Sequence, residues 1–289
     1  MFLRAGIPTL DELAALRGTA FFQRHVEFNR RFLHAHSQAM RAYGMRWGAD
    51  PLKLWSRQWE YPFAAGRLTA FASETGGREL TILDAGSGVT YFDYFLCSEM
   101  PGARVICCDS DASYARMFDA INAASGAGSV CFRRAVLQSL PLDDRSVDAI
   151  CCISVLEHTD RHEAILGEFQ RVLRPGGALV LTFDISLDGR FELKRSAAEA
   201  LLRSIVRRFV IRDDADIGAE LARLDDPAPL LSTDNIRRTE PQLLPWRHPW
   251  LLALRDVLCG RGFTGGFRSK TVYCLEARAP QDAPARGGR

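Results

Sequence analysis

The chain has 289 residues, 47% hydrophobic and 25% charged, a composition typical of a soluble globular protein. Lys and Arg number 37 against 35 Asp and Glu, and a net charge of +2 gives no reason to expect a nucleic-acid partner. No apolar run reaches the roughly 18 residues of a membrane helix, and the N-terminus lacks the plan of a signal peptide. We therefore expect a cytoplasmic protein without a membrane span, and a homo-oligomer stays open.

The eight cysteines contain no C-x-x-C pair, which argues against a zinc ribbon or a thioredoxin-type site. Cys107-Cys108 and Cys151-Cys152 fall inside apolar runs, where adjacent side chains point to opposite faces of a strand. We expect most of these thiols to be small buried hydrophobic groups in a reducing compartment, and we expect no metal site.

Residues 1–72 are predicted to form a helical cap. Thr9-Leu10-Asp11-Glu12 has the form of a capping box, and the stretch Ala20–Tyr43 has the apolar periodicity of one amphipathic helix. Trp59 and Tyr61 lie in an aromatic-rich segment that either packs in the core or covers a ligand as a lid.

After a polar linker at 73–78, short apolar runs alternate with helix-like stretches. The runs are Leu80–Leu83, Arg104–Cys108, Val130–Phe132, Val147–Ile153, Ala178–Phe183 and Thr271–Ala277, and the helices are Tyr91–Ser98, Ala112–Ala123, Arg161–Leu173 and Glu192–Arg208. This order predicts an α/β domain over 73–279, with a mostly parallel sheet covered by helices on both faces. We expect an irregular insertion at about 210–250 that contains Trp246–Trp250, and a disordered tail at 280–289.

A glycine-rich turn follows the first of these strands. Asp84 ends the strand, and Gly86 and Gly88 let the backbone turn sharply and approach a ligand closely. Asp109 ends the second strand about twenty residues further on, where nucleotide-binding α/β folds place an acid that accepts hydrogen bonds from ribose. The pattern predicts a nucleotide-type cofactor at the carboxyl ends of the strands.

Other interpretations of these residues stay open. Asp109-Ser110-Asp111 has the D-x-D form of a metal-dependent glycosyltransferase, although the glycine turn is then unexplained. A glycine turn and a ribose acid also serve NAD- or nucleotide-sugar-dependent enzymes.

Five motifs in order across residues 80–184 resemble the class I S-adenosylmethionine (SAM) dependent methyltransferases of the type 11 group. They are Leu83–Gly88 (LDAGSG), Asp109 at the end of the second strand, Leu140–Ile150 (LPLDDRSVDAI), Ile153–His158 (ISVLEH) and Arg171–Gly177 (RVLRPGG). The resemblance implies a Rossmann-like methyltransferase fold with an N-terminal helical cap, SAM as cofactor and S-adenosylhomocysteine (SAH) as product.

The resemblance also implies roles for individual residues. Those expected to bind the cofactor are Asp84, Gly86, Ser87 and Gly88 at the methionine end, Asp109 and Ser110 at the ribose, Leu137 and Gln138 at the adenine, Ile153 and Ser154 under the sulfonium, and Tyr61 as a lid. Two positions depart from the family pattern. Thr90 replaces the third glycine and is expected to cap the next helix with Asp93, and Val136 stands where many members carry an adenine-binding acid.

His158 is the best candidate for a catalytic base, because it follows the fourth strand and imidazole titrates near neutrality. A capping or packing histidine is the alternative, and Glu157 and Asp184 are further candidates for the base.

We predict a SAM-dependent methyltransferase with a small-molecule acceptor. Residues 59–62 and 184–186 loosely resemble methyltransferases of bacterial polysaccharide or secondary-metabolite pathways. A non-catalytic SAM-binding subunit is the remaining alternative.

Overall fold

The structure is a computed structural model, and it describes residues 3–126, 128–190, 193–212, 216–244, 254, 257–258 and 268–281. The segment Trp246–Trp250, and the predicted tail from residue 282 onward, lie outside these described residues.

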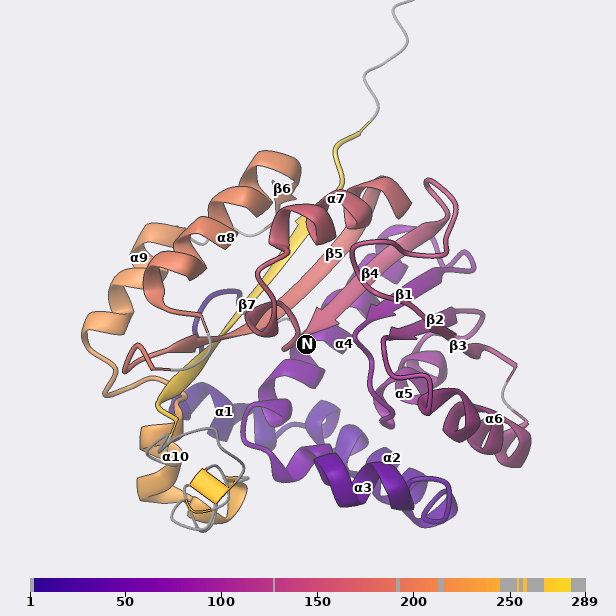
Figure 1. The fold of residues 1–289 in the computed structure, drawn as a ribbon, viewed down its shortest axis with the longest axis horizontal. Helices are drawn as coiled ribbons and strands as arrows, with labels where there is room; N and C mark the ends of the chain where they lie inside the picture. The colour runs from indigo at the N-terminus through magenta and orange to yellow at the C-terminus, as the bar shows by residue number, and fades with distance from the viewer. Residues whose placement is uncertain are drawn as a thin grey trace, which may run out of the picture.

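The centre of the protein is a seven-stranded sheet in the order β3-β2-β1-β4-β5-β7-β6 (Figure 1). The strands are β1 (Thr81–Ala85), β2 (Arg104–Asp109), β3 (Val130–Arg134), β4 (Val147–Ile153), β5 (Leu173–Ser186), β6 (Val210–Ile211) and β7 (Lys270–Arg278). β1 to β5 pair in parallel, whereas β7 pairs antiparallel with both β5 and β6. This arrangement confirms the mostly parallel sheet that the sequence predicts.

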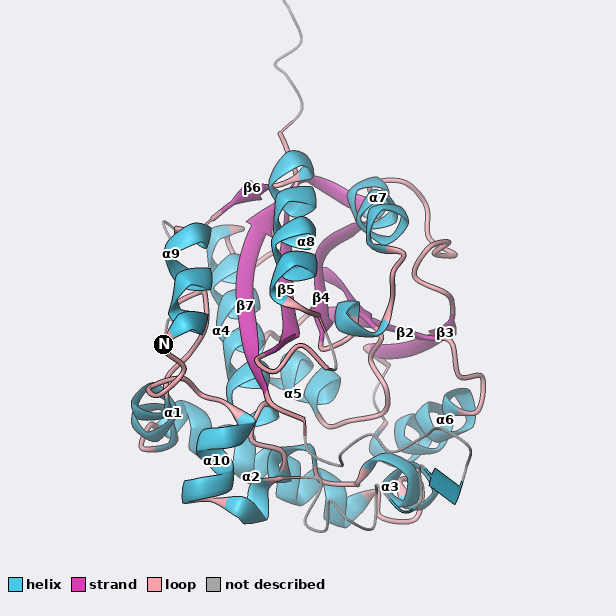
Figure 2. Cartoon of the chain, turned by 60° about the vertical axis from the view of Figure 1, so that its left-hand side comes forward, coloured by secondary structure: helices cyan, strands magenta, loops and turns pink. Residues whose placement is uncertain are grey.

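Helices cover both faces of the sheet (Figure 2). One face carries α4 (Arg57–Glu74), α5 (Phe92–Glu99) and α6 (Tyr114–Ser125), and the other carries α7 (His162–Val172) and α8 (Arg195–Arg208). The cysteine pairs divide between these faces as expected, because Cys107 and Cys151 belong to the core under α4 and α5, whereas Cys108 and Cys152 belong to the core under α7. Each face of the sheet therefore has its own apolar core.

The N-terminal helices are α1 (Leu10–Arg17), α2 (Ala20–Ala35) and α3 (Arg41–Trp47), followed by the 3₁₀ turn η1 (Pro51–Lys53). The predicted capping box is present, since the Glu12 amide donates to the Thr9 hydroxyl and the Thr9 amide donates to the Glu12 carboxylate at 2.7 Å. The predicted single helix over Ala20–Tyr43 is wrong. The chain leaves helical geometry at His36, where φ is −114°, and α3 then runs separately.

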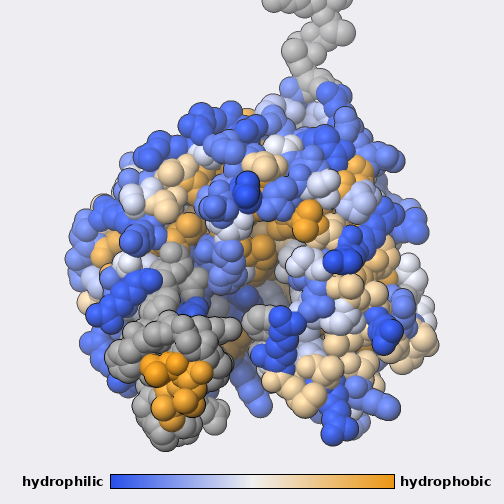
Figure 3. Space-filling view, in the orientation of Figure 1, coloured by the Kyte–Doolittle hydropathy of each residue, from blue (hydrophilic) through white to orange (hydrophobic). Residues whose placement is uncertain are grey.

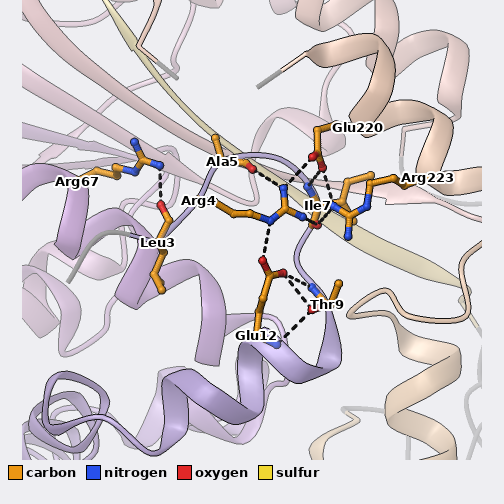
Figure 4. Close-up of polar contacts among 9 residues, drawn as sticks. All are labelled: Leu3, Arg4, Ala5, Ile7, Thr9, Glu12, Arg67, Glu220 and Arg223. Carbon is orange, nitrogen blue, oxygen red and sulfur yellow. Dashed lines mark hydrogen bonds and ion pairs between the residues drawn. The ribbon is translucent and has the colours of Figure 1, made fainter. Parts of the chain in front are cut away.

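A cluster of ion pairs ties the first residues to a distant helix (Figure 4). Arg4 pairs with Glu12 at 2.6 Å and with Glu220 at 2.7 Å, and Glu220 also accepts a hydrogen bond from the Ile7 amide. Gly6 forms an antiparallel bridge with Cys274 of β7, so the N-terminal segment lies against the edge of the sheet core. These contacts fix the N-terminal helices on the α/β domain.

The predicted irregular insertion contains regular structure. It includes α9 (Ile217–Ala222), η3 (Arg223–Asp225), α10 (Thr233–Thr239) and η4 (Pro241–Leu243). Leu221 packs in one core and Ile236 in the other, because each short helix buries one apolar position against the sheet or its covering helices. No helix among the described residues is long and apolar enough to cross a membrane.

The strand order reverses between β1 and β4, which are neighbours although β2 and β3 lie between them in sequence. In open α/β sheets, ligands bind at the carboxyl ends of the strands beside such a reversal. The fold therefore places Asp84, Asp109 and Ile153, which lie at the ends of three strands, around one location.

Candidate active site

Two adjoining cavities of about 330 and 280 Å³ lie at the carboxyl ends of β1, β2 and β4. Gly86, Asp109, Val155 and His158 line both, so the two cavities form a continuous site. Figure 3 shows that this face of the molecule is hollowed near its centre, where the ends of these strands meet in Figure 1.

The glycine turn between β1 and α5 forms the wall of the first cavity. Gly86 has φ +84°, and a Cβ there would lie 2.4 Å from a methyl carbon of Val155. Gly88 has φ +57°, and a Cβ there would lie 2.4 Å from the hydroxyl of Tyr43. Only glycine adopts this backbone at these close approaches without strain, so the turn stays thin beside the cavity.

Asp109 is held at the end of β2 by the turn itself. Its carboxylate accepts hydrogen bonds from the Gly88 amide at 3.2 Å and from the Asp111 amide at 3.1 Å. Asp111 instead pairs with Arg46 of α3 at 2.8 Å and accepts hydrogen bonds from Ser113. Asp109 thus faces both cavities with lone pairs left for a further donor, while Asp111 has a local structural role.

The second cavity is lined by the expected adenine-side residues. Ser110, Leu137 and Gln138 all border it, together with Val136. Leu137 is 8% exposed and supplies an apolar surface, whereas Val136 is 55% exposed at the position where many family members carry an acid. A flat heterocycle fits this mixture of apolar wall and flanking polar groups.

Asp84 lines the first cavity, but its own side chain is 4% exposed. Burial, together with the nearby Asp93, raises the pKa of Asp84 well above its ordinary value. Asp93 does not form the predicted capping box with Thr90. The Thr90 hydroxyl accepts from the Phe92 amide at 3.2 Å, and the Asp93 side chain is fully buried.

The end of β4 carries a strained residue. Ser154 has φ +51°, a left-handed conformation that is uncommon outside glycine, and its amide donates to the Thr182 carbonyl at 2.9 Å. Its hydroxyl accepts a 2.6 Å hydrogen bond from Arg57 Nη1 and donates one of 2.6 Å to Glu60 Oε1. Both partners come from α4, so the N-terminal helices hold this turn in place.

Arg57 and Glu60 form a buried ion pair one helical turn apart. Burial alone would raise the pKa of Glu60, but the charge of Arg57 and hydrogen bonds from Ser154 and Thr182 hold that pKa below its ordinary value. Burial works against the charge of Arg57, yet the nearby charge of Glu60 raises its pKa. The pair is therefore fully ionised at neutral pH.

Arg57 borders the site but is not among the residues that the sequence predicts there. It lines the first cavity, and its hydrogen bonds to Glu60 and Ser154 both use Nη1. Nε and Nη2 carry further donors that bond to no other described residue, and the side chain is 21% exposed. The segment Trp55–Phe63 is notable in sequence for its aromatic rings, and nothing there distinguishes this arginine from a surface charge.

The aromatic residues of α4 divide between the two expected roles. Tyr61 lines the first cavity and stacks on Phe92 with ring centroids 4.6 Å apart. Trp59 is 2% exposed and packs in the core rather than over the cavity. Tyr43 of α3 supplies a cover that the sequence analysis did not predict, because its ring packs against Tyr114 over the glycine turn.

The three candidate bases lie in different environments. His158 is exposed and lines both cavities. Glu157 is 8% exposed, and burial and the neighbouring Asp184 raise its pKa well above the ordinary value. Asp184 is 3% exposed and pairs with Lys270. Only His158 of these three borders the cavities in the described part of the chain.

Comparison with known proteins agrees with this geometry. Residues 83–181 match the family model described as "Methyltransferase domain". The chain is 32% identical over 156 residues to an uncharacterized methyltransferase of Mycobacterium ulcerans, covering 54% of this chain and 55% of the relative. It is 30% identical over 188 residues to a malonyl-[acyl-carrier protein] O-methyltransferase of Laribacter hongkongensis, covering 63% of this chain and 62% of the relative.

The chain thus spans little more than half the length of the curated relatives it matches. Among solved structures, a geranyl diphosphate methyltransferase in complex with SAM has the same fold, with a TM-score of 0.51 and 17% identity over 96% of this chain and 98% of that one. The matched domain contains the glycine turn, the ends of β2 and β4, and His158. Residues 83–181 therefore match a methyltransferase domain of the class I SAM-dependent kind, and the cofactor that such a domain implies is SAM.

Proposed function

We propose that this chain transfers a methyl group from SAM to a small-molecule acceptor. The observation that carries the proposal is the distribution of charge around the first cavity. Arg57, whose Nε and Nη2 bond to no other described residue, and the buried carboxyl group of Asp84 line the same cavity, and Asp109 lines both cavities. This pattern suits a ligand with a zwitterionic amino-acid end and a ribose.

Each end of SAM has a suitable partner in this arrangement. Arg57 would hold the α-carboxylate through Nε and Nη2, because a planar guanidinium binds carboxylates in a bidentate manner. Asp84 would hold the α-ammonium, Asp109 the ribose hydroxyls, and Leu137 and Gln138 the adenine. Gly86, Ser87 and Gly88 would approach the ligand through their backbone, with Ser110 beside the ribose.

SAM supplies an activated methyl group on its sulfonium, so the protein has to align the reactants and exclude water. The Arg57–Glu60–Ser154 network fixes the turn after β4, and Ile153 and Ser154 would lie beneath the sulfonium. Tyr43 and Tyr61 cover the cavity from the N-terminal helices and would keep bulk water out. His158 would face the acceptor and, where the acceptor needs it, accept its proton.

The size and cover of the site support a small acceptor. The first cavity measures about 330 Å³, a volume in the range of small-molecule sites, and residues of α3 and α4 line it. The resemblance of residues 59–62 and 184–186 to methyltransferases of bacterial polysaccharide or secondary-metabolite pathways makes such a pathway part of this proposal.

Two measurements test the proposal. Calorimetric titration should show binding of SAM and SAH but not of NAD or a nucleotide sugar. Turnover should then appear as SAH formation with at least one member of a panel of small carboxylates, phenols, thiols and amines. Binding of NAD in place of SAH would overturn the cofactor assignment, whereas SAH binding without turnover on any acceptor would favour a non-catalytic SAM-binding subunit.

A further inference from the structure

The turn that follows β3 forms one wall of the second cavity, which residues 135–138 line. A hydrogen bond of 3.0 Å from the Ser139 amide to the Val136 carbonyl closes the turn, and the Ala135 amide donates to the Asp109 carbonyl at 2.9 Å. These bonds fix the turn beside the end of β2, where the Asp109 carboxylate would hold the ribose.

The side chains of this turn differ in exposure. Leu137 is 8% exposed and belongs to the core under α7, so it forms an apolar wall of the cavity. Val136 is 55% exposed and Gln138 is exposed as well, although both line the same cavity. Val136 and Gln138 therefore form a rim at which the cavity opens to solvent.

The rim is the part of the site that the far edge of a bound purine would reach. The ribose is attached to N9 of the purine, so the edge with C6 is the one farthest from Asp109. In adenine, C6 carries an amino group, which donates hydrogen bonds. The groups on the rim therefore decide whether the site distinguishes one substituent at C6 from another.

The rim offers no charged acceptor to this amino group. Among the described residues that line the second cavity, Asp109 is the only carboxylate, and it lies at the ribose end. The Ser110 and Thr159 hydroxyls lie on the loops after β2 and η2 rather than on this turn. The Val136 side chain forms no hydrogen bonds. The Gln138 amide bonds to no other described residue, and its rotation presents either the carbonyl or the NH₂ group.

An exposed neutral contact replaces a contact with water and adds little net affinity. A site strongly rejects a ligand that lacks a donor only where it holds a buried acceptor for that donor. We propose that the rim of Val136 and Gln138 leaves the substituent at C6 of the purine unrecognised, so that cofactors with the 6-amino group deleted or alkylated bind as well as SAM. Val136 determines this specificity, because its side chain occupies the rim without an acceptor. The inference rests on the proposed function, since it places the adenine of SAM in the second cavity.

The experiment is a calorimetric titration of the full chain with SAH, with 6-deamino-SAH, in which hydrogen replaces the amino group, and with N6-methyl-SAH. These ligands keep the ring nitrogens unchanged, whereas a 6-oxo purine would also place a proton on N1. The wild type should bind all three with affinities within about threefold of one another, because no buried acceptor loses its donor.

Val136→Asp places a carboxylate on the rim and should create the missing selectivity. The variant should bind SAH about tenfold more tightly than 6-deamino-SAH, since only SAH donates a hydrogen bond to the charged acceptor. Val136→Asn is the matched control, because it has the same shape without the charge, and its affinities for these two ligands should stay within about threefold. Both substitutions are at an exposed position, outside the packed core.

A preference of about tenfold or more for SAH over either analogue in the wild type would overturn the inference. A Val136→Asp variant that binds SAH and 6-deamino-SAH equally would also overturn it, because the rim would then not face C6. Binding of SAH is the check that each variant is folded, and if Val136→Asp fails that check, the wild-type comparison decides the matter alone. Failure of the wild type to bind any of the three ligands would instead contradict the proposed function.

Discussion

Arg57 Nη1 donates a 2.6 Å hydrogen bond to Ser154 Oγ, and this contact joins helix α4 to the carboxyl end of β4. The same hydroxyl donates to Glu60, so three side chains hold a turn in which Ser154 has a strained backbone conformation. The N-terminal helices are therefore part of the site and not only a cover for it. We expect Arg57 to contribute to cofactor binding and Glu60 to contribute to the stability of the fold, and a different substitution tests each role.

Arg57→Lys is expected to weaken SAH binding by about 10–100-fold, because lysine keeps a positive charge beside Glu60 but loses the planar donors of the guanidinium. Binding of 5′-methylthioadenosine should be unchanged, since that ligand has no carboxylate. Calorimetry with both ligands measures the difference. An equal loss for the two ligands would show that Arg57 supports the fold of the site rather than the carboxylate.

Glu60→Leu should lower the free energy of unfolding by about 3–5 kcal/mol, because it leaves the charge of Arg57 buried without its partner. Urea denaturation of the wild type and the variant measures this cost. The double variant Glu60→Leu/Arg57→Met should recover part of the loss, since both charges are then gone. If the two substitutions destabilise additively, the ion pair is not the source of the effect.

Much of the α/β domain could be predicted because its signals are local. The glycine turn, the acid at the end of β2 and the residues after β4 each follow a strand, and the topology brings strand ends together. The break between α2 and α3 could not be predicted, because the residues around His36 carry no glycine or proline that would mark the end of a helix.

The other features that could not be predicted from the sequence depend on contacts between residues far apart in the chain. Arg57 lies 97 positions from Ser154, and its role depends on how α4 packs on the sheet. Asp93 has the spacing of a capping box with Thr90, and only the structure shows that its side chain is fully buried instead. Periodicity predicts which face of a helix is buried, but it does not predict which polar group on that face meets a second one.

Asp109→Ala should weaken SAH binding by about 1–3 kcal/mol, the cost of losing hydrogen bonds to a charged group. In contrast to Arg57→Lys, the loss should be equal for 5′-methylthioadenosine, because both ligands contain the ribose. Asp109→Asn is the matched control, since it keeps an acceptor for the Gly88 amide. Unchanged affinity in a folded Asp109→Ala variant would contradict the ribose assignment.

His158→Ala tests the acceptor side of the site. His158 lines both cavities from the 3₁₀ turn η2 (Leu156–His158), and its amide donates to the Val155 carbonyl at 3.0 Å, so its backbone position is fixed. If the imidazole accepts the proton of the acceptor, turnover should fall by roughly 10²–10⁴-fold while SAH affinity stays near that of the wild type.

His158→Gln keeps a hydrogen-bonding group without a base. Recovery of the acceptor KM but not of kcat in His158→Gln would indicate proton transfer, because positioning is then restored and the base is still missing. Recovery of both would assign His158 to positioning alone, and a loss of SAH affinity in either variant would move His158 to the cofactor side.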